Sequence, residues 1–437
     1  MDSEWKQFTL SKLCHLITDG KHGDCENQED SGFYFLSVKD VFGNRLNYEQ
    51  ARQITEKDFL ETHKRTNLEP GDVLFTNTGT IGRMAIAPED SKTYRTTFQK
   101  SVAILKPNRD FITPRFFYYL LSYDNARLSN FAGGTTQKNL LLKDFRNFPV
   151  RIPSLPIQQA IAHILGTLDD KIELNQQMNQ TLEAIARALF KSWFIDFDPV
   201  RAKLDGRQPI GMDAETAALF PAEFEDSAIG KIPKGWNVGM LRDCCDRVEN
   251  GGTPKRSESD YWEPGTIPWL TSGEVRQSIV TVTENFISEK GLANSSAKLW
   301  TPRTTVVAMY GATAGQVCLL AQKMCTNQAC CGLIPAKNKQ FFIYLQASNS
   351  VELLAQQARG SAQQNLSQKI VGDFPTVIPS DSVLKSFDEY VKSLFEKWIA
   401  NLEESKSLAS ARDTLLPKLL SGEIRVQDAE TVVEAVT

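Results

Sequence analysis

The segment Gly134-Thr135-Thr136-Gln137-Lys138-Asn139-Leu140 recurs in the second half of the chain as Gly360-Ser361-Ala362-Gln363-Gln364-Asn365-Leu366, at an offset of 226 residues (360 − 134). Phe148-Pro149 and Ile152-Pro153-Ser154 recur at the same offset. Ten of the 21 positions from 134 to 154 are identical in the two copies, whereas chance on average composition would give about one or two. The chain is therefore an internal duplication, and we expect it to bind something with two similar parts.

The repeat extends outward into two lobes of mixed α/β character. In the first lobe, apolar runs bounded by Gly, Asn or Pro predict strands at 33–38, 72–76 and 101–105. Pro114 suits the first turn of a helix predicted through Leu121. The second lobe keeps the same order, since 236–241, 304–309 and 341–345 match 5–10, 72–77 and the aromatic helix. We predict an α+β fold with a pseudo-two-fold internal repeat.

Each lobe is followed by a long predicted helix with apolar residues alternately four and three positions apart, which is the seam of a coiled coil. The first seam comprises Ile161, Leu165, Leu168, Ile172, Asn175, Asn179, Leu182, Ala186, Leu189 and Trp193. Adding 226 gives Phe387, Val391, Leu394, Trp398, Asn401, Ser405, Leu408, Arg412, Leu415 and Leu419. We predict that the two helices pack as an antiparallel coiled coil, each about 60 Å long at ~1.5 Å per residue.

Polar residues occupy the middle of both seams. In an antiparallel pair the midpoints meet, so Asn175 and Asn179 would face Asn401 and Ser405. Such a layer disfavours slipped registers, because a slip would bury the amides against leucine. The alternative is that these residues simply face solvent.

A length of 437 residues allows two to three domains. We predict a first lobe at 1–153, a spacer helix at 154–195, a linker at 196–228, a second lobe at 229–379, a spacer helix at 380–425 and a flexible tail at 426–437. Within these, we expect a short helix at 214–219 and a short strand at 423–426.

The net charge of −4 is unevenly distributed. The two lobes carry +2 and +4, while residues 154–228 and 380–437 carry −6 and −4. Basic lobes suit a phosphate backbone, although ordinary charge scatter explains so small an excess equally well. The polar start of the chain indicates no signal peptide, and no apolar run approaches the ~20 residues of a membrane span. Eight cysteines without metal-like spacing indicate reduced thiols in a cytosol.

Catalytic motifs are missing from the sequence. No P-loop and no dinucleotide-binding glycine motif occurs, and the segment 311–315 lacks the lysine of a phosphate-binding loop. The four histidines show no metal spacing and no nucleophile partner. Residues 88–92 faintly resemble a nuclease cluster, but an exposed charged loop is the better interpretation. We therefore expect no metal and no cofactor in this chain.

Loops with residues suited to ligand recognition, in contrast, occur at equivalent positions of the two copies. Residues 76–82 parallel 309–315, and 133–138 parallel 359–364. Glycines allow close backbone approach, while Gln, Lys and Arg can bond base edges or phosphates in the major groove. For each loop an ordinary turn is the alternative. The candidate DNA contacts are Lys21, His22, Thr76, Asn77, Thr80, Gln137, Lys138, Thr253, Lys255, Arg256, Tyr310, Thr313, Gln363 and Gln364.

Taken together, these features resemble the specificity subunit of a type I restriction–modification system over nearly the whole chain. The resemblance rests on the tryptophan that opens each lobe, as in Ile232-Pro233-Lys234-Gly235-Trp236, on the Gln-x-Asn-Leu segments, and on the stretches 189–203 and 415–424, which match that family's spacer regions.

The resemblance implies a non-catalytic bacterial-defence subunit of the cytoplasm. Two target-recognition domains would each read one half of a bipartite, asymmetric site on double-stranded DNA, and the helices would fix the gap. Two modification subunits would dock on the helices and supply S-adenosylmethionine and the methylating site, and ATP-dependent motor-nuclease subunits would join them.

Three alternatives stay open. The chain could be a methyltransferase or nuclease with an unrecognised motif, which methyl-donor binding would favour. It could be a coiled-coil adaptor that binds only proteins, or a decoy that copies the subunit's shape without reading DNA.

Overall fold

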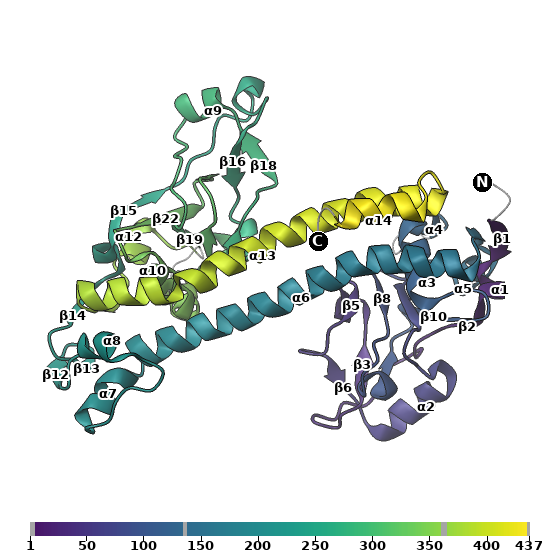
Figure 1. Ribbon diagram of the computed structural model, residues 1–437, viewed down its shortest axis with the longest axis horizontal. Coiled ribbons are helices and arrows are strands. Elements are labelled where there is room, and N and C mark those ends of the chain that lie inside the picture. Colours follow the sequence, from purple (N-terminus) through teal and green to yellow (C-terminus); the bar gives the residue numbers. More distant parts are fainter. Residues whose placement is uncertain (1–4, 134–137, 360–364, 435–437) are drawn as a thin grey trace. The chain divides into compact units, whose positions relative to one another are not determined.

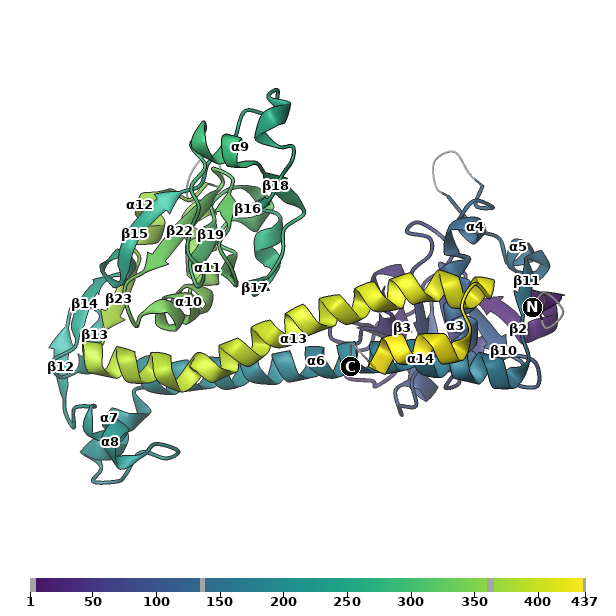
Figure 2. The ribbon, with the colours of Figure 1, turned by 45° about the horizontal axis from the view of Figure 1, so that its top comes forward.

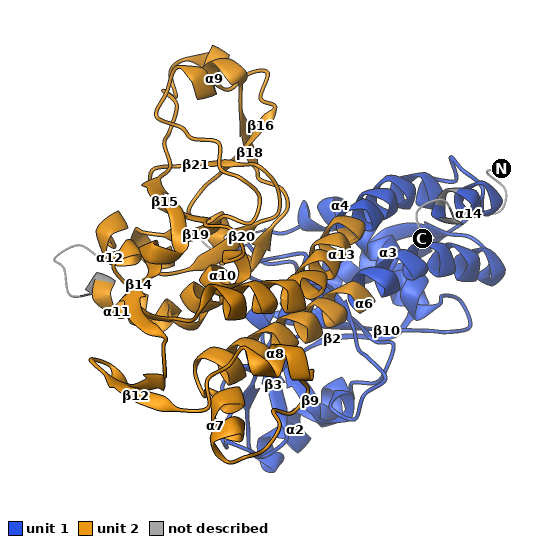
Figure 3. Ribbon diagram, turned by 60° about the vertical axis from the view of Figure 1, so that its left-hand side comes forward, with its two compact units in different colours: residues 1–173, 406–437 blue, residues 174–405 orange. Residues whose placement is uncertain are grey.

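We describe a computed structural model of the chain, covering residues 5–133, 138–359 and 365–434 (Figure 1). The chain forms two compact units, one of residues 1–173 with 406–437 and one of residues 174–405 (Figure 3). Each unit contains one lobe and half of each long helix. The boundary between units therefore passes through both helices, whereas the sequence suggested that the helices form segments of their own.

The first unit contains a four-stranded antiparallel sheet in the order β2 (Cys14–Asp19), β10 (Val102–Pro107), β7 (Val73–Thr76) and β8 (Met84–Ile86). A smaller sheet has the order β6 (Arg52–Gln53), β3 (Tyr34–Leu36), β9 (Thr96–Phe98). Two-stranded pairs are formed by β1 (Lys6–Thr9) with β11 (Pro149–Ile152) and by β4 (Val41–Phe42) with β5 (Arg45–Leu46). The three strands predicted for this lobe are all present, each shifted by one or two residues at its ends.

Helices pack around these sheets. The largest are α2 (Glu56–Thr66) and α3 (Pro114–Tyr123), with short helices α1 (Leu10–Leu13), α4 (Asn125–Ser129) and α5 (Leu142–Asn147). Helix α3 begins with proline, whose missing N–H is not needed in a first turn. Its aromatic run from Phe116 to Leu121 is buried in one core with β7 and β10, which confirms the predicted aromatic helix.

The second unit repeats this plan. Its main sheet has the order β15 (Cys245–Asn250), β22 (Cys330–Pro335), β19 (Thr305–Ala308), β20 (Val317–Leu320), β17 (Ile279–Val280). The first four strands follow the order of β2, β10, β7 and β8. A second sheet comprises β18 (Asn285–Ile287), β16 (Ile267–Leu270) and β21 (Cys325–Thr326), and β14 (Asn237–Met240) pairs with β23 (Pro375–Ile378). Helices α9 (Glu289–Ala293), α10 (Gln340–Asn349), α11 (Val351–Arg359) and α12 (Gln368–Gly372) complete the lobe (Figure 2).

The long helices are α6 (Leu155–Phe194) and α13 (Asp381–Ser421). In the first unit Asp169 accepts a hydrogen bond from Arg412 at 2.6 Å. In the second unit Asn179 bonds Asn401, and Trp193 contacts Phe387 with ring centroids 5.4 Å apart. In the first unit Ile157 and Ile161 also line one hollow with Leu419 and Leu420. In both units the residue numbers on α13 therefore fall as those of their partners on α6 rise, so within each unit the two helices run antiparallel, as predicted.

Most seam positions are buried as the heptad pattern requires. Exposed fractions are 9% or less at Ile161, Leu165, Leu168, Asn175, Asn179, Phe387, Val391, Trp398, Asn401, Leu408 and Leu415. Ile172, Leu182, Leu189 and Leu394 are partly buried against the same cores. Ser405 is also partly exposed.

The predicted polar layer is present. The amide of Asn401 donates to Oδ1 of Asn179 at 2.9 Å, and the amide of Asn175 donates to Ser405 Oγ at 3.3 Å and to Glu404 at 2.8 Å. The alternative that these asparagines face solvent is wrong, because all three are at most 6% exposed.

The segment predicted as a linker is folded. Residues 196–228 contain α7 (Asp198–Leu204), α8 (Ala214–Ala218) and β12 (Phe224–Ser227), and β12 pairs with β13 (Gly230–Pro233). Val200 and Phe220 are buried in the core of the second unit. The turn-rich composition therefore marked short connections inside a packed segment.

The tail also differs from its prediction. Instead of a strand at 423–426 and a frayed end, helix α14 (Val426–Glu434) follows α13. Ala429 and Val433 are buried in the core of the first unit. Val426 is partly buried against the same core. The amphipathic pattern of so short a segment was easy to miss in the sequence.

The cysteines behave as structural thiols. All eight are free, and burial raises the pKa of Cys14 and Cys325 to about 12. Among the described residues, no cluster of His, Cys, Asp or Glu could hold a metal ion. Within the same residues, every helix is too short or too polar to cross a membrane.

Candidate nucleic-acid interface

In the first unit, several loops lie together at one end of the strands of the main sheet. Strands β2 and β7 end where β10 and β8 begin, because neighbouring antiparallel strands alternate in direction. Residues 20–24, 77–83 and 99–101 therefore lie at the same edge, and the repeated segment 138–140 joins them. We call these four segments the loop edge of the first unit.

Hydrogen bonds tie the loop edge together. The amide of Lys21 donates to the carbonyl of Phe98 at 2.7 Å, and the amide of Asn77 donates to that of Ser101 at 2.9 Å. The amide of Leu140 donates to the carbonyl of Asn77 at 2.8 Å. The Thr78 hydroxyl donates to Asn139 Oδ1 at 2.9 Å. The repeated Asn139-Leu140 pair thus fixes the position of residues 77–83, which we call the glycine-rich loop; residues 309–316 are its counterpart in the second unit.

The second unit has a matching loop edge of residues 251–256, 309–316, 327–329 and 365–367. The amide of Gly251 donates to Cys330 at 3.0 Å, and that of Met309 donates to Ala329 at 2.8 Å. The amide of Leu366 donates to Met309 at 2.8 Å. The duplicated segments therefore make the same backbone hydrogen bond to the glycine-rich loop in both units.

In the first unit, two residues predicted to contact DNA lie next to carboxylate side chains. Lys21 Nζ lies 3.3 Å from both Asp58 and Glu61, and His22 Nε2 lies 3.1 Å from Asp19. Burial alone would lower the pKa of the Lys21 ammonium, but the hydrogen bonds to Asp58 and Glu61 raise it above its ordinary value. His22 keeps a side chain that is 62% exposed.

Three residues that the sequence predicted to contact DNA are buried, so they do not face a ligand as predicted. Thr76, Asn77 and Thr313 are only 0%, 4% and 8% exposed. The Thr76 hydroxyl donates to Thr80 O at 2.6 Å and accepts the amide of Arg83 at 2.9 Å. These side chains shape the loops from inside. Sequence alone could not separate them from their exposed neighbours, because polar loop residues that face inward or outward have the same composition.

The other described candidates lie on the surface or near it. Thr80, Lys138, Lys255, Arg256 and Tyr310 are exposed. The Arg256 guanidinium lies 3.9 Å from the Trp262 ring centroid, a stacking contact that orients it while leaving its donors open. The Thr253 hydroxyl bonds Gln328. Gln137, Gln363 and Gln364 lie outside the described residues, and these contacts stay predictions.

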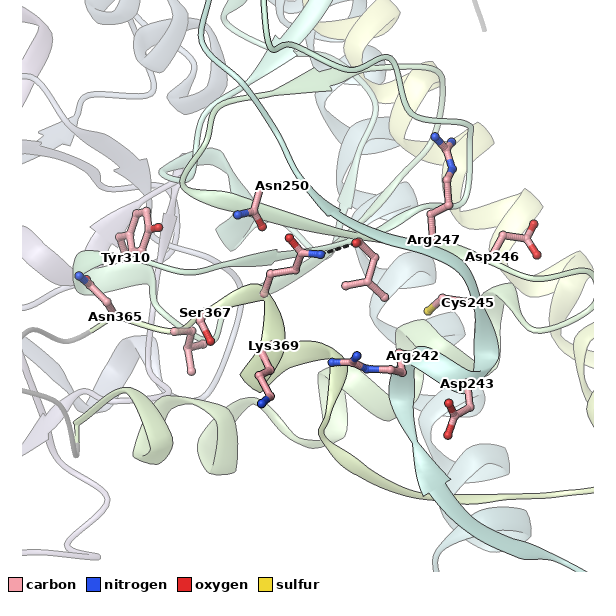
Figure 4. Close-up of a pocket in the computed structure, with 13 residues that line it drawn as sticks. Arg242, Asp243, Cys245, Asp246, Arg247, Asn250, Tyr310, Asn365, Ser367 and Lys369 are labelled. Atoms are coloured by element: carbon pink, nitrogen blue, oxygen red, sulfur yellow. Dashed lines mark hydrogen bonds between the residues drawn. The ribbon is translucent and has the colours of Figure 1, made fainter.

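A surface hollow of about 980 Å³ adjoins the loop edge of the second unit. Figure 4 shows Tyr310, Asn365 and Ser367 together at one end of it and Asp246 toward the other. Oδ1 of Asn250 is buried here without a hydrogen-bond partner within the described chain. Sequence reasoning missed Asn250, Arg247 and Lys369; only Lys369 carried a signal, because Lys143 stands at the matching position of the first copy.

Comparison with known proteins agrees with this arrangement. The profile described as the type I restriction modification DNA specificity domain matches residues 2–184 and again residues 233–399. This chain belongs to that family. Each matched stretch of the specificity domain contains one loop edge, so the family assignment and the internal duplication agree.

Specificity subunits resemble the chain along its length. It is 28% identical over 475 residues to the type I restriction enzyme HindI specificity subunit of Haemophilus influenzae, covering 97% of this chain and 100% of that subunit. Identity to the MjaIX specificity subunit of Methanocaldococcus jannaschii is 29% over 383 residues, covering 86% and 83%. The crystal structure of the S subunit from M. genitalium has the same fold, with a TM-score of 0.59 at 16% identity over 95% and 96% of the two chains.

Proposed function

We propose that this chain is the DNA sequence-recognition subunit of a type I restriction–modification complex. The observation that carries the proposal is a loop edge built the same way in both units but from different residues, such as Lys21 and His22 against Lys255 and Arg256. A shared scaffold with different side chains suits two different half-sites on one DNA. Each unit would read one half of a bipartite, asymmetric site.

In this proposal the chain catalyses nothing itself. The paired long helices fix the gap between half-sites and dock two modification subunits, which supply S-adenosylmethionine and the methylating site. ATP-dependent motor-nuclease subunits join them in the cytoplasm. Two major-groove contacts on one face of DNA lie about one helical turn, ~34–36 Å, apart, a spacing that helices of 40 and 41 residues are long enough to cover.

The decisive experiment is to sequence the methylome of cells that express this chain with its modification subunit. We expect methylated adenines in two different half-sites separated by a constant unread gap. A palindromic site would contradict two dissimilar readers. Loss of methylation without this chain is the matched control.

Substitution of Lys255 and Arg256 tests the loop edge directly. Lys255→Gln with Arg256→Gln should weaken binding of the complex to the mapped duplex and reduce the slope of log affinity against log salt by at most about 1.8, or ~0.9 per phosphate contact. Lys290→Gln is the control, because Lys290 is exposed and paired with Asp260 in the same lobe. Unchanged affinity would remove this loop from the DNA.

A further inference from the structure

Several of the ten identical positions lie among the described residues, and the structural role of their side chains can be named. Leu140 and Leu366 are 0% and 2% exposed, and Phe148 and Phe374 are 2% and 7% exposed, so core packing explains them. Asn139 accepts the Thr78 hydroxyl and so holds the loop edge. Folding therefore accounts for these repeated residues.

Lys143 and Lys369 are different. They are identical at the 226-residue offset, lie on the corresponding helices α5 and α12, and are exposed. Within the described chain, neither ammonium makes a hydrogen bond or an ion pair. An exposed lysine without a partner contributes little to folding, so folding does not explain why both copies carry it.

Both lysines lie next to the loop edge of their unit, where a bound ligand would contact them. Each lysine lies three residues after the leucine whose amide bonds the glycine-rich loop, at Asn77 in the first unit and Met309 in the second. In the second unit Lys369 also lines the hollow that contains Tyr310 and Asn365 (Figure 4). Arg242, on the same hollow, is ion-paired with Asp373, whereas Lys369 is not paired.

The chemistry of the ligand follows from what the two half-sites share. Different side chains on the two loop edges suit different bases, but the phosphate backbone is the same in every half-site. A lysine ammonium is a compact point charge with three donors, which suits a phosphate oxygen and carries little base preference.

We infer that Lys143 and Lys369 bind DNA phosphates at corresponding places of the two half-sites, independently of the bases read there. This inference rests on the proposed function. The two lysines set the position of each unit on the backbone, and the loops that differ between the units supply the sequence preference.

The test uses the full chain in complex with its modification subunit and the variants Lys143→Gln, Lys369→Gln and the double variant. Binding is measured between 50 and 200 mM salt to the mapped duplex and to one with both half-sites scrambled. Each substitution should reduce the slope of log affinity against log salt concentration by about 0.9. Between 50 and 200 mM salt, the factor by which affinity falls should therefore be about 3.5 times smaller for each lysine replaced. The ratio of affinities for the two duplexes should stay at the wild-type value.

Lys337→Gln is the matched control. Lys337 is an exposed lysine that follows the end of β22, at the sheet edge opposite the loop edge, so its substitution should leave the slope unchanged. Unchanged slopes in the two lysine variants would overturn the inference, as would a changed ratio of affinities for the mapped and the scrambled duplex. Loss of sequence preference in the wild-type complex would instead overturn the proposed function, and the slopes on the scrambled duplex would still decide the lysines.

Discussion

At the scale of single residues, the hydroxyl of Thr76 shows how a loop can depend on one buried group. It accepts the Arg83 amide and donates to Thr80 O while fully buried. Thr76→Val should lower the free energy of unfolding by about 1–3 kcal/mol, because a buried N–H loses its acceptor. Urea denaturation measures this loss. Thr76→Ser keeps the hydroxyl and should cost clearly less, and equal losses for Val and Ser would show that the hydroxyl does not matter.

Asp388 gives the second residue-scale prediction. Burial raises its pKa to about 6, although it accepts the Phe341 amide at 3.0 Å. Glu389 also raises this pKa and Lys392 lowers it. Because the folded pKa exceeds the ordinary 3.8, the contribution of Asp388 to stability is fully present below that value and is lost as the pH rises through 6.

Asp388→Asn should therefore be more stable than the wild type above pH 6, since the amide stays neutral and can still accept the Phe341 N–H. The advantage should shrink as the pH falls to 4. Thermal unfolding at pH 4, 5, 6 and 7.5 measures the difference between the two proteins. A difference that does not change with pH would contradict the prediction.

At the scale of elements, the asparagine layer specifies how α6 and α13 pair. Asn401 and Asn179 are bonded side chain to side chain, and Asn175 bonds Ser405 in the same polar layer of a mostly apolar seam. Asn401→Leu should lower the free energy of unfolding by about 1–3 kcal/mol, because Asn179 is left buried and unpaired. Adding Asn179→Leu should recover much of the loss, since two leucines pack well.

A double-mutant cycle from urea denaturation measures this coupling. Ile185→Leu is a control, because Ile185 is an exposed residue of the same helix. Additive losses in the double variant would mean that the two asparagines do not act as a pair.

At the scale of the whole molecule, the proposed function predicts that helix length sets the gap in the DNA site. Inserting seven residues after Ile172 and seven before Leu408 keeps the heptad pattern in both helices and adds about 10 Å to each. The half-sites should stay the same, and the gap should lengthen by about three base pairs at 3.4 Å per base pair. Methylome sequencing reads both quantities. An unchanged gap would refute the role of the helices as a ruler.

Insertion into α6 alone is the matched control. It places the asparagines opposite apolar positions of α13, so the seam pairs out of register. Methylation should then fall, because the helices no longer form one defined pair. Full activity at the original gap would contradict both the layer's role and the ruler.

By itself the sequence determined the duplication, the element order of both lobes, and the antiparallel pairing with its asparagine layer. These follow from periodicity and from a constant offset, which are properties of the chain read along its length. The short helix predicted at 214–219 is present as α8. The packing of the other linker residues and helix α14 were missed, because short polar segments owe their structure to neighbours far away in the sequence.

Only the tertiary structure decided which polar side chains face inward and what joins each lobe to its helices. In the first unit Arg115 donates to Asp170 and Tyr119 donates to Asp169, each at 2.5 Å. At the positions of the second unit that align with Arg115 and Asp169, Phe341 stacks on Phe395 with ring centroids 4.3 Å apart. Likewise Thr76 is buried while Lys143 is exposed. The physical reason is that exposure and pairing depend on groups brought together from distant parts of the chain, and a local sequence pattern does not contain them.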